Sequence, residues 1–367
     1  MSTERVLVAL SGGVDSSVAA LLLQQQGYDV IGVFLRNGID KPSSSQNNKQ
    51  GCCSVEDSRD AALVADKLGI PFHAVDMEGE FEGIMDYFAA EYRAGHTPNP
   101  CVICNRDIKF GAMWKLADAL GAHHLATGHY ARVVQGEHGA ELHRGLDAHK
   151  DQSYVLFPIG PERLGRVLLP VGELQKSRTR EIAHEAGMPV FDKPDSVEIC
   201  FVPSGDYREL LRERGGLGIP GNIVDRGGQV LAQHDGHAGF TRGQRRGLGF
   251  AWQHPMYVLD INPHNGDVLV GPRESTGCRS ALVGGFQTFA YSLPKNQQWL
   301  PIVAQFRSNP GGVEAQMRGL ENGQIEVRFQ QPADSVNPGQ GLAVYLGERL
   351  LGGGWIESTE LECGFQV

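Results

Sequence analysis

The sequence has no long hydrophobic run. No apolar stretch approaches the roughly 20 residues that a helix needs to cross a bilayer, and no signal-peptide pattern opens the chain. We therefore expect a cytoplasmic protein with no membrane partner. Its 41% hydrophobic and 21% charged residues are typical of a globular chain. With 367 residues it exceeds what one core usually supports, so two or three domains are expected.

Cysteine is too scarce and irregular for a disulfide framework. The seven cysteines are odd in number and unevenly spaced, unlike those of small secreted proteins. In a reducing compartment such cysteines are catalytic, metal-binding or buried. The CxxC of Cys101 and Cys104 has no second CxxC to complete a four-cysteine zinc site, so a zinc half-site and a pair of buried thiols remain alternatives to reactive thiols.

Positive charge is in deficit, with a formal net charge of −10. Phosphate contacts normally supply most of the affinity for RNA, so a nucleic-acid surface would have to be a local basic patch. The strongest basic cluster is Arg242, Arg245 and Arg246, within Thr-Arg-Gly-Gln-Arg-Arg-Gly. The cluster predicts either a binding site for RNA phosphates or an ordinary solvated surface.

The most informative stretch joins an apolar run, Val6 to Leu10, to a helical pattern through Gly12 and Gly13. It predicts a strand, a phosphate-binding loop and a helix. Glycines let the backbone N–H groups approach an anion, and the helix start adds partial positive charge. The stretch has neither the Lys-Ser/Thr ending of a Walker loop nor the third glycine of the dinucleotide fingerprint. It resembles the SGGxDS loop of the ATP-pyrophosphatases, which cut ATP between its α and β phosphates.

Strand and helix patterns alternate through the first half of the chain. They predict a parallel sheet with helices on both faces and a ligand beyond the carboxyl ends of its strands. The expected ATP-binding residues lie at three such ends: Ala9, Leu10, Ser11, Gly12, Gly13, Val14, Asp15, Ser16, Leu35 and Gly128. Asp15 either caps the following helix or orients Mg2+, and we favour the second.

The strand and helix alternation ends near residue 205. Glycine-rich sequence with short β runs predicts a small central domain, and alternating runs from about residue 279 predict a small antiparallel barrel. We expect three domains, at 1–204, 205–278 and 279–367.

Thiol chemistry is predicted at the CxxC, because the start of the following helix lowers a thiol pKa below its ordinary value of ~8.5. Cys200 lies alone in an apolar run, where a cysteine is more often a core residue. The remaining cysteines are predicted to be a surface pair with weak redox sensitivity, Cys52 and Cys53, and two packing residues, Cys278 and Cys363.

Several motifs, in order and spacing, resemble those of the tRNA-specific 2-thiouridylases. They are SGGVDSS, TPNPCVICNRDIKFG, ATGHYAR at 126–132, KDQSYVLF at 150–157, DSVEICFV, FTRGQRRGLG at 240–249 and LGGGWI at 351–356. The resemblance implies an α/β fold: a parallel-sheet ATP-pyrophosphatase domain (PP-loop, adenine nucleotide alpha hydrolase-like), a central tRNA-binding domain and a C-terminal antiparallel β-barrel. It also implies an enzyme, a tRNA-uridine 2-sulfurtransferase acting on the wobble uridine.

The implied chemistry explains why a phosphate loop and two thiols occur together. A carbonyl oxygen is a poor leaving group, so ATP with Mg2+ would adenylate O2 and release pyrophosphate. Sulfur would then reach C2 from a persulfide on one cysteine, released when a second thiol forms a disulfide with it. By resemblance, Cys200 carries the persulfide and Cys104 is the nucleophile or resolving thiol. The implied partner is a persulfide donor such as a cysteine desulfurase or a sulfur relay protein.

Cys101 departs from the family pattern, since many members have Asp at this position. The thiol is either a thiolate base or, with Cys104 and Cys200, part of a three-cysteine set. Such sets resemble those of related tRNA thiolases that hold a four-iron four-sulfur cluster, whose free iron would bind hydrosulfide. The cluster route is the alternative to the persulfide route.

The resemblance further implies tRNA contacts in all three domains, with the target uridine flipped into the Cys104 pocket. The expected contacts are Asn99, Pro100, Cys101, His129, Lys150, Asp151, Gln152, Arg242, Arg245, Arg246, Arg307, Ser308 and Gln340. Two other functions share part of the pattern. An amide-forming ATP-pyrophosphatase would need neither thiol, and a tRNA-binding protein would hold ATP only as a structural ligand.

Overall fold

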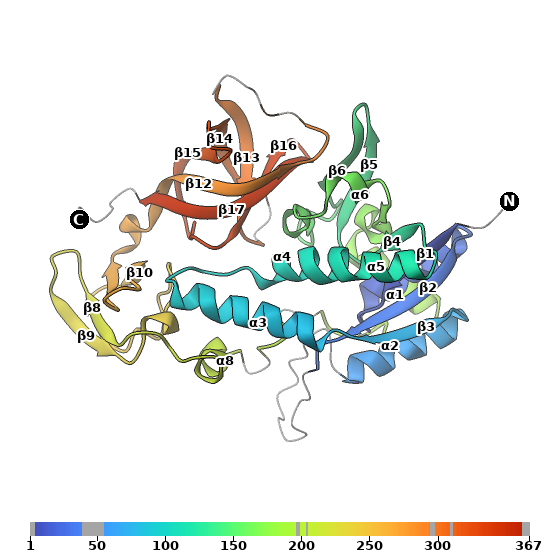
Figure 1. Ribbon diagram of the computed structural model, residues 1–367, viewed down its shortest axis with the longest axis horizontal. Coiled ribbons are helices and arrows are strands. Elements are labelled where there is room, and N and C mark those ends of the chain that lie inside the picture. Colours follow the sequence, from blue (N-terminus) through green and yellow to red (C-terminus); the bar gives the residue numbers. More distant parts are fainter. Residues whose placement is uncertain are drawn as a thin grey trace.

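The computed structural model describes residues 4–38, 55–195, 199–202, 205–291, 293, 298–308 and 311–361. Residues 39–54, which include the Cys52 and Cys53 pair, and Cys363 lie outside these residues. The molecule is elongated, with the N-terminal sheet at one end, a middle domain at the other and a barrel between them on one side (Figure 1). Across the described ranges, no helix has the length and apolarity needed to cross a membrane.

A five-stranded parallel sheet forms the N-terminal domain, in the order β3-β2-β1-β4-β7. Its strands are β1 (Arg5–Ala9), β2 (Asp29–Arg36), β3 (Phe72–Asp76), β4 (His124–Ala126) and β7 (Val167–Leu168). The chain adds β2 and β3 on one side of β1 and then β4 and β7 on its other side. Open α/β sheets bind ligands at the point between β1 and β4 where this order reverses. The Ser11 loop and Gly128 follow the two strands that flank this point.

Helices cover both faces of this sheet, as alternating side chains of β1 show. Leu7 belongs to one hydrophobic core with α3 and α4, whereas Val6 and Val8 belong to a second core with α1, α2 and α7. The helical elements of the domain are α1 (Val14–Gln25), α2 (Val55–Leu68), α3 (Glu78–Arg93), α4 (Pro100–Cys104), η1 (Asn105–Ala112), α5 (Met113–Ala119), η2 (Ser153–Leu156), α6 (Pro161–Leu164), η3 (Pro170–Glu173) and α7 (Lys176–Glu185).

The CxxC segment is helical from Pro100. The sequence pattern predicts a helix over 107–120, but the structure continues helically from Pro100 to Ala119. Its central part, η1, is a π-helix, a rare geometry that is frequent at functional sites. Cys104 is the residue at which the geometry changes, so the thiol lies at an irregularity of the helix.

The C-terminal sheet closes into a barrel by pairing β12 with β17. Its strands are β12 (Gly277–Thr288), β13 (Leu300–Gln305), β14 (Val313–Gly319), β15 (Ile325–Asp334), β16 (Gly341–Leu346) and β17 (Arg349–Leu361). A hairpin of the N-terminal segment, β5 (Ala131–Gly136) and β6 (Gly139–Arg144), extends the barrel sheet through β6 and β17. The first and last parts of the chain therefore share one sheet. The predicted division into domains at 1–204, 205–278 and 279–367 does not include this shared sheet.

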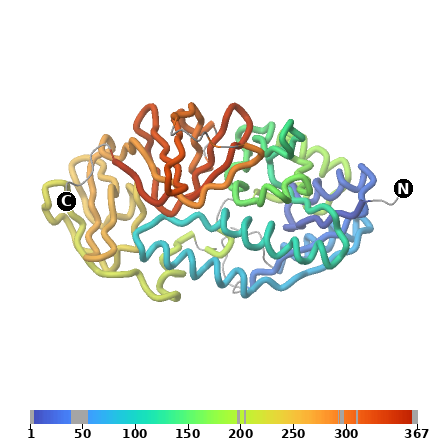
Figure 2. The backbone as a smooth tube through the Cα atoms, turned by 45° about the horizontal axis from the view of Figure 1, so that its top comes forward, coloured from blue at the N-terminus to red at the C-terminus, as the bar shows by residue number. Residues whose placement is uncertain are grey.

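The middle domain consists of α8 (Tyr207–Glu213) and a small sheet in the order β10-β11-β8-β9. The strands are β8 (Gly221–Val224), β9 (Val230–His234), β10 (Tyr257–Ile261) and β11 (Val268–Gly271), with the short turns η4 (His237–Gly239) and η5 (Arg273–Ser275). Helix α3 reaches this domain, as the tube in Figure 2 shows. Arg93 at its end donates to the Arg214 carbonyl at 2.6 Å, and Tyr92 stacks on Tyr207.

Candidate active site

The glycine loop adopts a conformation that its sequence requires. Gly12 has φ +71°, and a Cβ there would lie 2.2 Å from the Asp57 carbonyl oxygen. Ser16 ties the loop to the first turn of α1, since its Oγ accepts from the Ser11 N–H at 3.1 Å and donates to the Gly13 carbonyl at 3.2 Å. Ser17 Oγ donates to the same carbonyl at 2.8 Å. The loop is thus held in shape by its own hydroxyl groups.

The end of β4 lies directly against the start of α1. A Cβ on Gly128 would lie 2.6 Å from the Ser16 backbone nitrogen and 2.8 Å from the Asp15 carbonyl carbon. Two of the three strand ends that are predicted to bind ATP, at the Ser11 loop and at Gly128, therefore lie together. The residue at the third strand end, Leu35, is only 8% exposed and belongs to the hydrophobic core. Leu10 and Val14 are buried as well, so only their backbone can face a ligand.

Asp15 forms an ion pair with a lysine that is 161 residues away in the sequence. Lys176 Nζ, at the first residue of α7, donates to both Asp15 carboxylate oxygens at 2.7 and 2.8 Å. The Tyr130 hydroxyl donates to the same carboxylate at 2.8 Å. Asp15 does not cap α1, because Gly13 is the N-cap and no side chain bonds there. The pattern of the sequence singles out Asp15 but contains no signal for Lys176.

The predicted metal role of Asp15 does not fit these contacts. Both of its oxygens already face an ammonium group. Across the residues that the structure describes, no three His, Cys, Asp or Glu side chains gather in a way that would hold a metal ion. Cys101, Cys104 and Cys200 are not among such a group in the described residues, and their role as cluster ligands stays a prediction.

Asp195 connects the nucleotide loop to the Cys200 segment. Its carboxylate accepts from Lys150 at 2.7 Å, Lys176 at 2.8 Å and Arg180 at 2.7 Å. Partial burial raises the pKa of Asp195, but the hydrogen bonds from Lys150 and Lys176 outweigh burial and hold it at about 2. Asp195 is therefore ionised throughout the physiological pH range. It lies five residues before Cys200, the predicted persulfide carrier.

Lys193 makes a second link from this segment to the loop. Its Nζ donates to the Gly12 carbonyl at 2.9 Å and to Asp57 at 2.8 Å, and it also pairs with Asp60. The carbonyl of Gly12 thus faces a lysine. Sequence reasoning missed Lys176 and Lys193, because each acts through a partner more than 150 residues away.

The two predicted sulfur-transfer cysteines border one hydrophobic core. Cys104 and Cys200 are both half-buried and both pack against the core that contains α3. Val102 beside Cys104 is fully buried there, and Phe201 beside Cys200 meets Phe88 of α3 edge to face at 5.4 Å. Segments far apart in sequence are therefore anchored on the same helix, each with its thiol at the edge of the core.

Cys101 is exposed and lies near Tyr154, a residue of the KDQSYVLF motif for which the sequence predicts no role. Burial raises the pKa of Tyr154, and the charge of a Cys101 thiolate raises it further. Ser308, one of the predicted tRNA contacts, lowers the pKa of Tyr154. Tyr154 thus lies near both Cys101 and Ser308.

His129 is buried and held as a neutral imidazole. Its Nδ1 lies 2.7 Å from Thr127 Oγ1 and its Nε2 lies 3.4 Å from Lys109 Nζ. An ammonium group only donates, so Nε2 accepts and the ring proton sits on Nδ1, facing Thr127. Burial lowers the pKa of His129 well below its ordinary value, and Lys109 lowers it further. The predicted tRNA contact of this residue is therefore not an ionic one.

Several other predicted tRNA contacts have structural partners within the protein. Asn99 Oδ1 accepts from Val102 N at 3.3 Å as the N-cap of α4, and Pro100 is buried. Asp151 is 8% exposed and accepts from Arg144 at 2.8 Å. Gln152 accepts from Tyr130 N, Gln340 from Asn337 N, and Lys150 pairs with Asp195. Their tRNA roles remain predictions.

The predicted arginine cluster divides into one internal and two external side chains. Arg242 is 17% exposed and pairs with Asp260 at 2.5 Å, which places it inside the middle domain. Arg245 and Arg246 are exposed, as are Arg307 and Ser308 at the end of β13. The outward-facing part of the predicted RNA surface is therefore smaller than the sequence cluster.

The chain has three parts. They are a parallel-sheet domain with a nucleotide-type loop, a middle domain and a barrel. Three family models match successive parts of the chain: tRNA methyl transferase HUP domain at residues 4–204, tRNA methyl transferase PRC-barrel domain at 208–272 and Aminomethyltransferase beta-barrel domain at 286–356. The expected fold class is thus confirmed.

Curated relatives match almost the whole chain. A protein named tRNA-specific 2-thiouridylase MnmA from Carboxydothermus hydrogenoformans is 44% identical over 96% of this chain and 98% of its own length. Its namesakes in Rhodopirellula baltica and Geobacter metallireducens are 42% and 43% identical, over 96% and 98% of this chain and the same shares of their own lengths. The chain belongs to the family of the tRNA-specific 2-thiouridylases.

Proposed function

We propose that the protein is an ATP-dependent tRNA-uridine 2-sulfurtransferase that converts the wobble uridine of tRNA to 2-thiouridine. The observation that carries the proposal is the pairing of two machineries in one domain. A glycine loop held by Lys176 and Lys193 suits a triphosphate, and Cys104 and Cys200 border one hydrophobic core of the same domain. Relatives over nearly the full length carry the name tRNA-specific 2-thiouridylase.

The glycine loop would serve the adenylation step. The uridine O2 attacks the α-phosphorus of ATP, an O–P bond forms, and the bond to pyrophosphate breaks. Backbone N–H groups of the loop and the start of α1 stabilise the departing negative charge. Lys176, with a side chain only 11% exposed, supplies a positive charge that Asp15 and Asp195 hold in place. Mg2+ would accompany ATP through its phosphates, without a dedicated protein site.

The thiol pair would serve the sulfur-transfer step. Cys200 accepts a sulfur atom from a persulfide donor, such as a cysteine desulfurase or a relay protein. The Cys104 thiolate attacks Cys200 Sγ, a disulfide forms, and the electron pair of the broken S–S bond stays on the terminal sulfur. That sulfur bonds to C2 while AMP leaves with the former O2. A thiol reductant then restores both cysteines before the next turnover.

Nucleoside mass spectrometry tests this proposal. Unmodified tRNA is incubated with the purified protein, Mg-ATP and a persulfide donor, while pyrophosphate release and iron content are recorded on the same sample. Formation of 2-thiouridine by iron-free protein is the expected result. Pyrophosphate without thiouridine, persisting after addition of sulfur partners and after cluster reconstitution with sulfide, would instead identify a ligase of the same fold. Thiouridine only after reconstitution would select the cluster route.

A further inference from the structure

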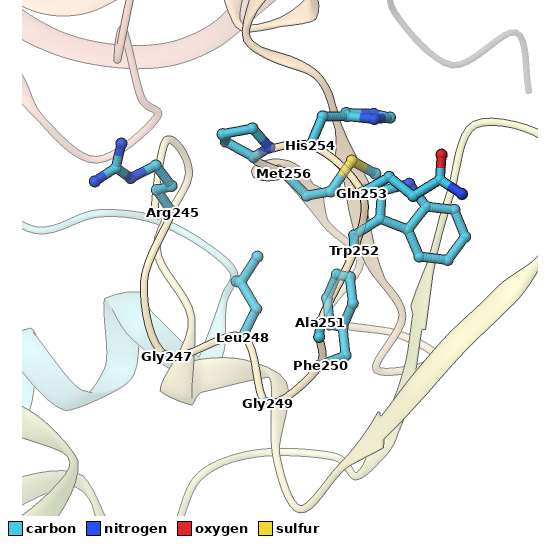
Figure 3. A pocket seen from close by; sticks show the side chains of 11 residues that line it. Arg245, Gly247, Leu248, Gly249, Phe250, Ala251, Trp252, Gln253, His254 and Met256 are labelled. Carbon is cyan, nitrogen blue, oxygen red and sulfur yellow. The ribbon is translucent and has the colours of Figure 1, made fainter.

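A cavity of about 610 Å3 lies in the middle domain, in the loop that follows the arginine cluster. Its lining includes Arg245, Leu248, Phe250 and Trp252. In Figure 3, Arg245 lies on one side of the hollow and Trp252 on the other, with Leu248 and Phe250 between them. This volume falls within the range of small-ligand sites in proteins.

The chemistry of the lining suits an unpaired nucleotide. Trp252 is 43% exposed, so part of its indole ring is open to a ligand. Aromatic faces bind unpaired bases by stacking, whatever the base. Arg245 adds a positive charge, and among the described residues that line the cavity none is acidic. In a chain of net charge −10, this selects for an anionic ligand.

Arg245 also lines a second cavity, of about 370 Å3, where the middle domain meets the barrel. Arg273 and Arg307 line it too, and Asp334 is the one carboxylate among its described lining residues. Arg273 is 73% exposed, and its guanidinium lies 3.9 Å from Asp334, so most of its charge faces solvent. Three arginines from two domains thus border a hollow adjacent to the aromatic one, and Arg245 is common to both.

We propose that this pair of cavities is an RNA-binding subsite, in which Trp252 stacks on an unpaired base and Arg245, Arg273 and Arg307 bind the adjoining backbone phosphates. The inference rests on the proposed function, because it takes tRNA as the ligand. The middle domain lies at the opposite end of the molecule from the sheet that carries the glycine loop (Figure 1). The Trp252 cavity therefore lies far from the glycine loop.

Direct binding measures the subsite without requiring catalysis. The dissociation constant for an unmodified tRNA transcript is measured at fixed salt, without ATP, for the wild type and for Trp252→Ala, Trp252→Phe and Arg245→Ala. Val230→Ala is the matched control, since Val230 is 54% exposed on β9 of the same domain. Loss of stacking should weaken binding on the order of 5- to 100-fold in Trp252→Ala, with Trp252→Phe near the wild type.

Three further readouts separate the subsite from a general disturbance. Binding of tRNA should quench tryptophan fluorescence in the wild type but less in Trp252→Phe. In thiolation assays Trp252→Ala should raise KM for tRNA and leave kcat unchanged. A plot of log affinity against log salt concentration has a negative slope, and Arg245→Ala should make this slope shallower by about 0.7–0.9. Wild-type affinity in Trp252→Ala, or equal weakening in Val230→Ala, would overturn the subsite. Absence of thiouridine from the wild-type reaction would overturn the proposed function alone, since the binding comparison still stands.

Discussion

Lys176 Nζ lies 2.7 and 2.8 Å from the two carboxylate oxygens of Asp15, across 161 residues of sequence. The pair places a nearly buried ammonium group beside the start of α1, where the dipole of the helix already favours an anion. Asp195 shares the same ammonium at 2.8 Å. One lysine therefore connects the nucleotide loop with the segment that leads to Cys200.

Replacing Lys176 by Met should lower pyrophosphate release about 100-fold or more. The variant removes a positive charge from the place where negative charge develops, and it leaves Asp15 without its cation. Arg178→Met is the matched control, because Arg178 is on the same helix but pairs with Glu181 and Glu185 at the surface. Release of pyrophosphate from tRNA and ATP is the measurement. Equal rates in the two variants would exclude Lys176 from the adenylation step.

The two glycines of the loop should respond differently to alanine. Gly12→Ala forces a side chain against the Asp57 carbonyl at positive φ, so we expect a loss of about 1–3 kcal/mol in the free energy of unfolding. Gly13 has φ −106°, and the nearest atom to an added Cβ is Ser11 Oγ at 3.5 Å. Gly13→Ala should therefore fold normally and yet lose pyrophosphate release, because its methyl group enters the phosphate space. Full activity of Gly13→Ala would argue against a phosphate cradle.

Cys200→Ser should abolish thiouridine formation while pyrophosphate release stays detectable, since adenylation needs no thiol. The control is Cys278→Ser. Cys278 is fully buried, its Sγ donates to the Ser280 carbonyl at 3.0 Å, and burial raises its pKa to about 11, so it is an unreactive thiol. Nucleoside mass spectrometry and a pyrophosphate assay give the two readouts. Retained thiolation in Cys200→Ser would refute the carrier role.

His129 should make folding stability depend on pH. The folded protein keeps its imidazole neutral, because burial lowers the pKa, whereas the unfolded chain takes up a proton below about pH 6.5. The contribution of His129 is therefore complete above pH 6.5 and decreases as the pH falls from there towards the folded-state pKa. The slope is at most about 1.4 kcal/mol per pH unit. Urea unfolding between pH 7.5 and 5.5 should show a shallower dependence in His129→Gln, and identical slopes would contradict the assignment.

Local pattern was sufficient for much of the fold. The strand, loop and helix over residues 5–25 follow from an apolar run, two glycines and a helical repeat, which are properties of neighbouring residues. The class of the N-terminal domain and the barrel were predictable for the same reason. The helix of the CxxC begins at Pro100 rather than at residue 107, because the five residues of α4 are too few to show a helical period.

The sequence by itself determined the glycine loop, the thiols and the order of the three parts, since each depends on residues close together in the chain. Tertiary structure alone decided which charges meet. Lys176 reaches Asp15, Arg242 turns inward to Asp260, and β6 pairs with β17 of the barrel. A periodic pattern says which face of an element is buried but not what covers it. Ion pairs and strand partners across long separations are fixed only when the faces pack.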